Sequence, residues 1–115
     1  MPVSITLGDA GNTVTLSTID LLVGGSGTDM VVLSAGQAGA TINLGAGNDT
    51  LVVTGTNTLT VSNTEVINGS TGTDLLVLAA TVAGVSVNLG AGTDTLQLTA
   101  GTNSLAFSGI ESVLA

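Results

Sequence analysis

The sequence contains no lysine, arginine or histidine, so its eight acidic residues have no cationic partner and the formal net charge is −8. We expect no nucleic-acid partner, because nothing in the chain can neutralise phosphates. An anionic membrane surface is disfavoured for the same reason, and no apolar run is long enough for membrane insertion. Acidic groups that folding brings together would repel one another unless metal ions entered between them.

Cysteine is absent and aromatic residues are almost absent. The lack of cysteine excludes disulfides and thiolate metal sites, although it does not define the cellular compartment. The hydrophobic content is 43%, yet Phe107 is the one aromatic residue. The core must therefore consist of small and β-branched side chains, which suit a solenoid better than a compact two-layer domain.

The missing residue types also argue against catalysis. The chain offers no histidine, cysteine, lysine, arginine or tyrosine as a base, nucleophile or electrophile. A carboxylate pair can hydrolyse glycosides, but an active site needs one special place and the acidic residues here recur at equivalent positions. We expect that the protein is not an enzyme.

What the sequence does contain is a recurring glycine turn that carries one aspartate and leads into an apolar run. Two close copies occupy residues 44–52 and 89–97, and two variants occupy residues 24–32 and 69–77. The aspartate holds the same place in all four copies, and Asn12 holds that place in a degenerate copy near the N-terminus. These aspartates are Asp29, Asp49, Asp74 and Asp94.

The turns belong to a longer internal repeat. Residues 20–64 match residues 65–111 with an offset of 45, which becomes 46 after one inserted residue. Residues 4–19 read as a degenerate half repeat. We expect one domain over residues 1–115.

Side-chain alternation after each turn indicates stacked parallel strands. Counting from each turn aspartate, or from Asn12, the second and fourth residues are apolar in every copy, as expected of inward-facing columns. The predicted columns are Val14, Val31, Leu51, Leu76, Leu96 and Leu16, Leu33, Val53, Leu78, Leu98. The sequence predicts an all-β, right-handed parallel β-roll or β-helix solenoid of about five coils, with its glycine–aspartate turns stacked along one edge.

Residues 24–32 fit the pattern G-G-x-G-x-D-x-U-x, in which U is a large apolar residue. This stretch resembles the nonapeptide of repeats-in-toxin proteins, the haemolysin-type calcium-binding repeat, and the composition is similar to that of S-layer proteins and adhesins with such repeats. The other copies depart from the pattern, because Leu44 and Leu89 replace its first glycine and Ser70 replaces its second.

The resemblance implies calcium ions between stacked turns, with ligands from glycine carbonyls and aspartate carboxylates. We expect at most one ion between each of Asn12/Asp29, Asp29/Asp49, Asp49/Asp74 and Asp74/Asp94. An alternative is that each aspartate bonds its own turn as an Asx-turn. The candidate metal ligands are Asp29, Asp49, Asp74, Asp94, Asn12, Gly25, Gly27, Gly45, Gly47, Gly72, Gly90 and Gly92.

A second acidic set, Asp20, Glu65 and Glu111, occupies matching positions of the repeat. These side chains would either complete the shell of an ion or bond backbone N–H groups at a corner of the coil. Asn57 and Asn103 also match across the repeat and would form a polar ladder.

These patterns predict a secreted, calcium-binding structural protein that assembles with itself into an extracellular filament or surface layer. The contacts would run through open solenoid ends or through an apolar outer stripe of Met30, Val32, Val52, Leu75 and Val77.

Two other functions fit the sequence. The chain is alternatively a calcium-dependent folding or spacer module of a larger adhesin or secreted hydrolase. Ice binding is a minor alternative, based on the threonine column Thr13, Thr50 and Thr95. We expect a secreted or cell-surface location. Residues 111–115 resemble the C-terminal signal of type 1 secretion substrates, but a last strand is the stronger interpretation, because residues 65–67 are their internal counterpart.

Overall fold

The computed structural model describes residues 3–114, so residues 1, 2 and 115 of the predicted domain lie outside the described residues. These described residues form strands and no helix, and none of them belongs to a helix that would cross a bilayer. The strands are β1 (Ser4–Thr6), β2 (Thr13–Leu16), β3 (Leu21–Val23), β4 (Met30–Leu33), β5 (Ala38–Asn43), β6 (Thr50–Val52), β7 (Thr58–Ser62), β8 (Val66–Asn68), β9 (Leu75–Leu78), β10 (Ala83–Asn88), β11 (Thr95–Gln97), β12 (Ser104–Ser108) and β13 (Ser112–Leu114).

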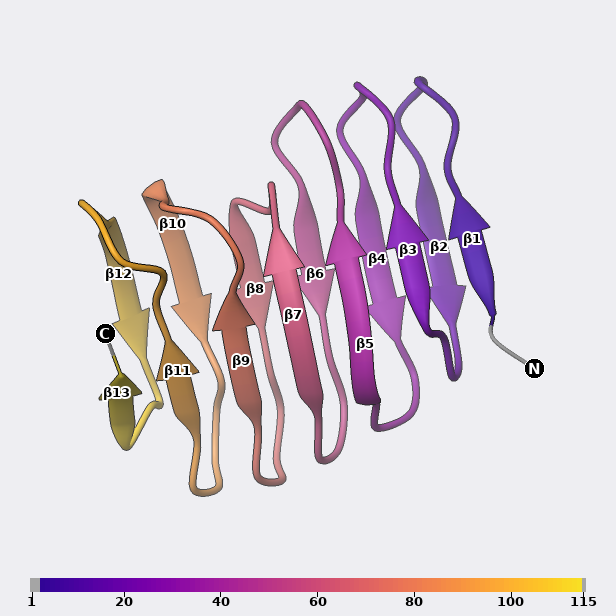
Figure 1. Ribbon diagram of the computed structural model, residues 1–115. Coiled ribbons are helices and arrows are strands. Elements are labelled where there is room, and N and C mark those ends of the chain that lie inside the picture. Colours follow the sequence, from indigo (N-terminus) through magenta and orange to yellow (C-terminus); the bar gives the residue numbers. More distant parts are fainter. Residues whose placement is uncertain (1–2, 115) are drawn as a thin grey trace.

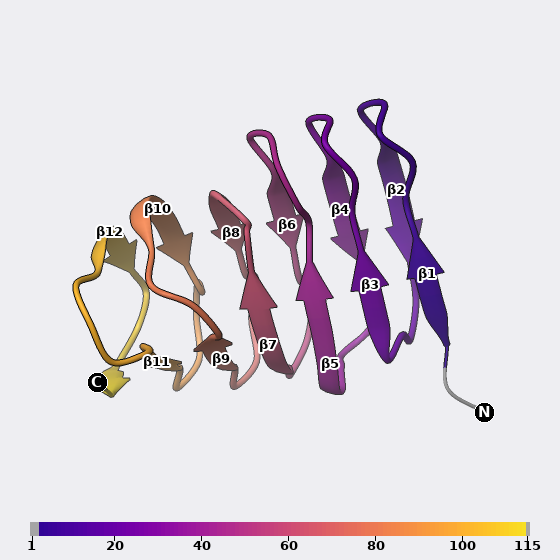
Figure 2. The same ribbon diagram turned by 45° about the horizontal axis from the view of Figure 1, so that its top comes forward.

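The strands form two parallel sheets that face one another (Figures 1 and 2). The odd-strand sheet has seven strands in the order β1-β3-β5-β7-β9-β11-β13, and the even-strand sheet has six in the order β2-β4-β6-β8-β10-β12. The chain passes from one sheet to the other after every strand and so makes about six turns. The predicted fold class, an all-β parallel solenoid, is confirmed.

The core lies between the two sheets. It consists of the apolar side chains at every second position of each strand, which point inward. Leucine, isoleucine and valine fill it, and their stiff or branched side chains pack well on a pleated surface. Val14, Leu16 and Leu98 of the predicted columns are partly buried. The largest fully buried side chains are Leu22, Leu33, Ile42, Leu44, Leu51, Ile67, Leu76, Leu78, Leu89, Leu96, Val31 and Val53.

The predicted columns place Leu76 next to Leu51, and this part of the prediction is wrong. β6 pairs with β8, so Leu51 stacks on Ile67, whereas β9 pairs with β7, so Leu76 stacks on Leu59. The reason is that the interval between Asp49 and Asp74 contains three strands, which make one and a half coils. Counting that interval as a single coil predicts about five coils where the structure has about six.

The 45-residue repeat contains five strands, which is an odd number. Residues 20–64 contain β3 to β7 and residues 65–111 contain β8 to β12, so that each strand and its equivalent lie in opposite sheets. Leu22 of β3, for example, faces the core from the odd-strand sheet, and its equivalent Ile67 faces it from the even-strand sheet. One repeat is therefore related to the next by half a turn about the solenoid axis.

This half turn separates the aspartate turns, so the prediction of a single edge is wrong. We call edge 1 the side where the chain passes from the odd-strand to the even-strand sheet, and edge 2 the opposite side. Asp29 and Asp49 precede β4 and β6 and lie at edge 1, whereas Asp74 and Asp94 precede β9 and β11 and lie at edge 2.

The predicted outer columns are divided in the same way. Met30, Val32 and Val52 lie in the even-strand sheet and Leu75 and Val77 in the odd-strand sheet, so they form no continuous apolar stripe. The threonine column is divided as well, because β2 and β6 carry Thr13 and Thr50 but β11 carries Thr95. Ser112–Leu114 form the last strand, β13, as the strand alternative predicts.

Candidate functional site: two ladders of carboxylates

Edge 1 carries a ladder in which each side chain accepts a hydrogen bond from the coil before it. Asp29 Oδ1 accepts from the backbone N–H of Asn12 at 3.0 Å, and Asp49 Oδ1 accepts from that of Asp29 at 2.7 Å. Glu65 Oε2 accepts from the N–H of Asp49 at 2.8 Å and ends the ladder. The side chains therefore link the turns of successive coils along this edge.

Edge 2 carries an equivalent but longer ladder. Gln37 Oε1 accepts from the N–H of Ile19 at 3.0 Å, and Asn57 Oδ1 accepts from that of Gln37 at 2.9 Å. The bonds continue from Asn57 N to Asp74 Oδ1 at 2.9 Å, from Asp74 N to Asp94 Oδ1 at 2.8 Å and from Asp94 N to Glu111 Oε2 at 2.7 Å.

Glycines let these turns stack closely. Gly45 and Gly47 have φ values of +81° and +116°, which L side chains rarely adopt. A Cβ added at Gly45 would collide with the carbonyl oxygen of Gly25 in the coil below, and one added at Gly47 with that of Gly27. The equivalent turn at edge 2 uses Gly90 in the same way.

All four turn aspartates are buried, with exposed fractions between 0% and 3%. One oxygen of each, Oδ1, accepts the ladder hydrogen bond, whereas the other, Oδ2, is buried and has no hydrogen-bond partner. An unpartnered buried carboxylate oxygen is costly, since it has lost its water and gained nothing in exchange. These four oxygens are Asp29 Oδ2, Asp49 Oδ2, Asp74 Oδ2 and Asp94 Oδ2.

Burial raises the pKa of both Asp49 and Asp74 above the ordinary aspartate value of 3.8. For Asp49, the backbone N–H of Asp29 opposes this shift, and the charges of Asp29 and Glu65 add to it. For Asp74, hydrogen bonds from Asn57 oppose the shift, and the charge of Asp94 adds to it. Both groups are therefore protonated more readily in the folded protein than in the unfolded chain.

In the absence of divalent cations, the protein should lose stability as the pH rises. The folded-state pKa values of Asp49 and Asp74 lie above their unfolded values, so the folded state binds more protons in the window that begins near pH 3.8 and extends upward. We expect a higher melting temperature at pH 4.5 than at pH 7 when thermal unfolding is followed by circular dichroism in chelator. The double variant Asp49→Asn/Asp74→Asn should flatten this dependence. An unchanged slope would show that other groups cause it.

The structure brings together two of the expected aspartate pairs. Asp29 and Asp49 stack at edge 1, and Asp74 and Asp94 stack at edge 2. Asp49 and Asp74 lie at opposite edges, so the ion expected between them is wrong.

Asn12 does neighbour Asp29, but its backbone N–H and its amide Nδ2 both donate to Asp29 Oδ1. The side-chain amide of Asn12 therefore already hydrogen-bonds the Asp29 carboxylate at this position. The Oδ1 atoms of the four aspartates bond the preceding coil and not their own glycine turns, which differs from the Asx-turn alternative.

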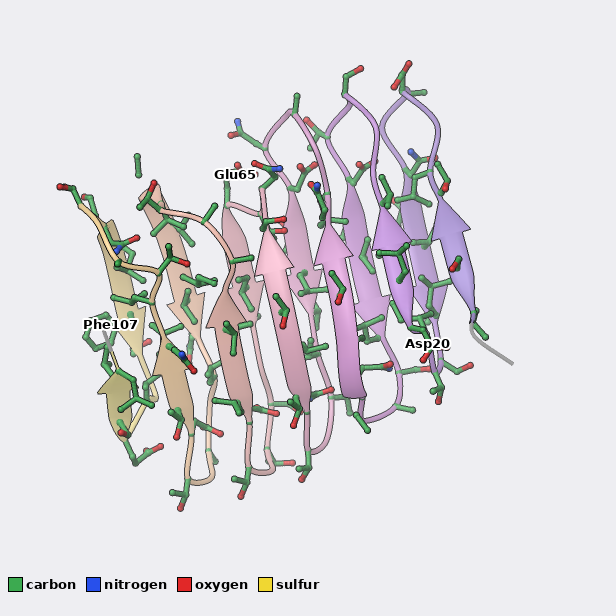
Figure 3. All side chains as sticks on the ribbon, viewed as in Figure 1. Asp20, Glu65 and Phe107 are labelled. Atoms are coloured by element: carbon green, nitrogen blue, oxygen red, sulfur yellow. The ribbon has the colours of Figure 1, made fainter. Side chains whose placement is uncertain are left out.

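The second acidic set bonds backbone N–H groups of the preceding coil. Asp20 Oδ2 accepts from Val3 at 2.6 Å, and Glu65 and Glu111 accept from Asp49 and Asp94. Asp20 and Glu65 lie at opposite edges, as Figure 3 shows, because they are separated by five strands. Each of these residues holds the turn beneath it in place.

Sequence reasoning missed Gln37 as a buried member of the edge 2 ladder and Asp9 as an exposed acidic residue of the first edge 1 turn. The expected stacking of Asn57 and Asn103 is wrong, because Asn57 belongs to the edge 2 ladder whereas Asn103 lies at edge 1 and accepts from the N–H of Val82. The number of strands per repeat is the signal that would have placed Asn57 and Asn103 at opposite edges.

The second repeat has a gap where the first has Gln37. In the first repeat, the Gln37 amide also donates to the carbonyl oxygens of Ser17 and Ala35. Its equivalent is Val82, which cannot replace these bonds, and a pocket of about 190 Å³ opens beside it, lined in part by Ser62, Thr64 and Ala80.

Replacement of Val82 by glutamine should repair this gap. The new amide would reach the N–H of Thr64 and neighbouring carbonyls, so we expect the free energy of unfolding to rise by about 1 kcal/mol. Val82→Met is the control, since it fills the same space without hydrogen bonds. Urea denaturation of both variants measures the difference, and equal stability would mean that the amide finds no partners.

In the described part of the chain, no three acidic side chains converge on one point. A metal ion at either edge would therefore combine two carboxylates with backbone carbonyl oxygens. The residues placed for this are Asp29 and Asp49 at edge 1, and Asp74 and Asp94 at edge 2, together with the glycine turns that precede them. Comparison with protein-family models, curated proteins and solved structures gives no match for this chain.

Proposed function

We propose that this protein is a calcium-binding structural solenoid that assembles with copies of itself into an extracellular filament or surface layer. One observation carries the proposal: each edge holds two stacked, buried carboxylates, each with an unpartnered oxygen, in a chain without a single cationic side chain. A proton or a metal ion must neutralise such groups, and at neutral pH a divalent cation is the better candidate.

The donor set suits calcium. Carboxylate and carbonyl oxygens are hard ligands, and calcium accepts six to eight of them at about 2.3–2.6 Å. Neighbouring coils lie about 4.8 Å apart, which is about twice this distance, so one ion fits between the stacked carboxylates of two coils. The resemblance of residues 24–32 to the repeats-in-toxin nonapeptide supports the same ion.

The role proposed for calcium is to neutralise and join successive coils. At edge 1 the ligands are Asp29, Asp49 and carbonyls of Gly25, Gly27, Gly45 and Gly47. At edge 2 they are Asp74, Asp94 and carbonyls of Gly72, Gly90 and Gly92. The protein thereby becomes a stiff rod only where calcium is abundant, as it is outside cells.

Assembly is supported by what the C-terminal end of the solenoid exposes. Phe107 is 50% exposed and Val113 39% exposed, although both continue inward-facing columns of the core. Strand edges that lack a neighbour tend to pair with other chains.

Electron microscopy and sedimentation in millimolar calcium, and again after chelation, test this function. We expect filaments or sheets in calcium and their loss on chelation. A chain that stays monomeric in calcium at high protein concentration would contradict assembly. If such monomers still bound calcium, the spacer-module alternative would replace it.

A further inference from the structure

The C-terminal end of the solenoid presents core residues and unpaired strands. Phe107 of β12 stacks on Val87, and Val113 of β13 stacks on Leu96. Nothing in the described part of the chain covers their other sides. Figure 3 shows Phe107 at this end of the molecule.

The N-terminal end offers the matching surface. Ile5 of β1 and Val14 and Leu16 of β2 continue the inward columns, and each is only partly buried. Both ends therefore display an apolar strip between two strand edges, which is a cross-section of the same core.

The backbone hydrogen-bonding groups of the two ends are in phase. Ser112 N and Leu114 O bond to the β11 side, so alternation directs the N–H and C=O of Val113 away from the solenoid. In β2, Asn12 O and Leu16 O bond to β4, so Thr13 and Thr15 direct theirs away on either side of Val14. Parallel pairing of Val113 with Val14 of another copy therefore places two inward-facing residues beside each other.

Two parallel head-to-tail arrangements are conceivable, and the number of strands distinguishes them. The described residues form 13 strands, so both the first and the last strand belong to the odd-strand sheet. Stacking a second copy in the same orientation, with β1 on β13, leaves an empty strand position between β12 and the incoming β2. Turning the second copy by half a turn places its β1 beside β12 and its β2 beside β13, with no empty position.

We infer that a second copy of this chain docks on the C-terminal end after half a turn about the solenoid axis, so that each sheet continues into the opposite sheet of the next copy. The inference rests on the proposed self-assembly and specifies its geometry. The internal repeat already uses the same operation, since its five strands also exchange the two sheets. Six and a half coils per copy at about 4.8 Å give an axial rise of about 31 Å.

Cysteine cross-linking tests this geometry, and the absence of natural cysteines makes it unambiguous. Ser112, Thr13 and Ser4 are exposed residues in β13, β2 and β1. The half turn places Ser112 beside Thr13 of the next copy, at a strand spacing that a disulfide spans. The unrotated arrangement places Ser112 beside Ser4 instead.

The experiment mixes Ser112→Cys protein with Thr13→Cys protein in millimolar calcium, and separately with Ser4→Cys protein, under mild oxidation. Calcium is included because the half turn also brings the exposed Asp9 turn and Glu111 to one edge. We expect at least tenfold more mixed disulfide dimer in the first mixture than in the second. The reverse ratio, or an image reconstruction without the half turn, would overturn the inference while leaving self-assembly intact. Monomers in every mixture would overturn both.

Discussion

Calcium is expected to raise the free energy of unfolding by about 5 kcal/mol when its free concentration exceeds the dissociation constant a hundredfold. Each site that binds only the folded state contributes about 2.7 kcal/mol under these conditions, and the structure offers one pair of stacked aspartates at each edge. Relief of the repulsion between two buried carboxylates contributes to the affinity and therefore sets the calcium concentration at which this gain is reached. Urea denaturation in calcium and in chelator measures it.

Two variants make this expectation specific. Asp49→Asn keeps the Oδ1 atom that accepts from Asp29 but removes the charge, so it should abolish about half of the calcium effect. Asp20→Asn removes the same charge from an exposed carboxylate outside the two aspartate pairs, and it should leave the calcium effect unchanged. Equal losses in both variants would show that calcium acts through net charge alone.

Replacement of Gly92 by alanine is expected to destabilise the protein by about 3 kcal/mol or more. Gly92 has a φ of +126°, and an added Cβ would collide with the carbonyl oxygen of Gly72 in the coil below. Backbone strain and steric overlap each contribute about 1–3 kcal/mol, and a backbone carbonyl cannot swing aside as a side chain can.

Two other glycines separate the contributions. Gly84 has a φ of +80° but nothing within 4 Å of an added Cβ, so Gly84→Ala should cost only the strain, about 1–2 kcal/mol. Gly8 has neither constraint, and Gly8→Ala should change stability by less than about 0.5 kcal/mol. Thermal and urea denaturation rank the three variants. A Gly92→Ala protein as stable as Gly8→Ala would contradict the stacking of the edge 2 turns.

The fold class and most core positions could be predicted from the sequence, because side-chain alternation with period two reports directly which residues face inward. Val31, Leu51, Leu76 and Leu96 are all buried, as the columns predict. The residues that stack on them in neighbouring coils could not be predicted in the same way. A two-sided coil leaves the same local pattern in both sheets, so Leu51 and Leu76 look equivalent in sequence although they face the core from opposite sides.

The candidate site could also be predicted only in part from the sequence. The turn aspartates stand out as repeated carboxylates, and the pairs Asp29/Asp49 and Asp74/Asp94 follow from a spacing of two strands per interval. The ladder member Gln37 does not stand out, because an amide can supply the same acceptor oxygen without repeating the residue type. Asn57 stands out as a repeated residue, but its bond to Asp74 does not follow from that repetition. The unpartnered Oδ2 atoms depend on packing between coils, which no local motif reports.

Calcium titration by isothermal calorimetry counts the ions bound at the two edges. We predict two calcium ions per chain, one at each edge, because each edge holds one pair of buried aspartates with unpartnered oxygens. Asp49→Asn and Asp94→Asn should each retain one ion, and the double variant should bind none. Absence of binding to the wild-type chain, or the same stoichiometry in all four proteins, would contradict calcium binding by the paired aspartates.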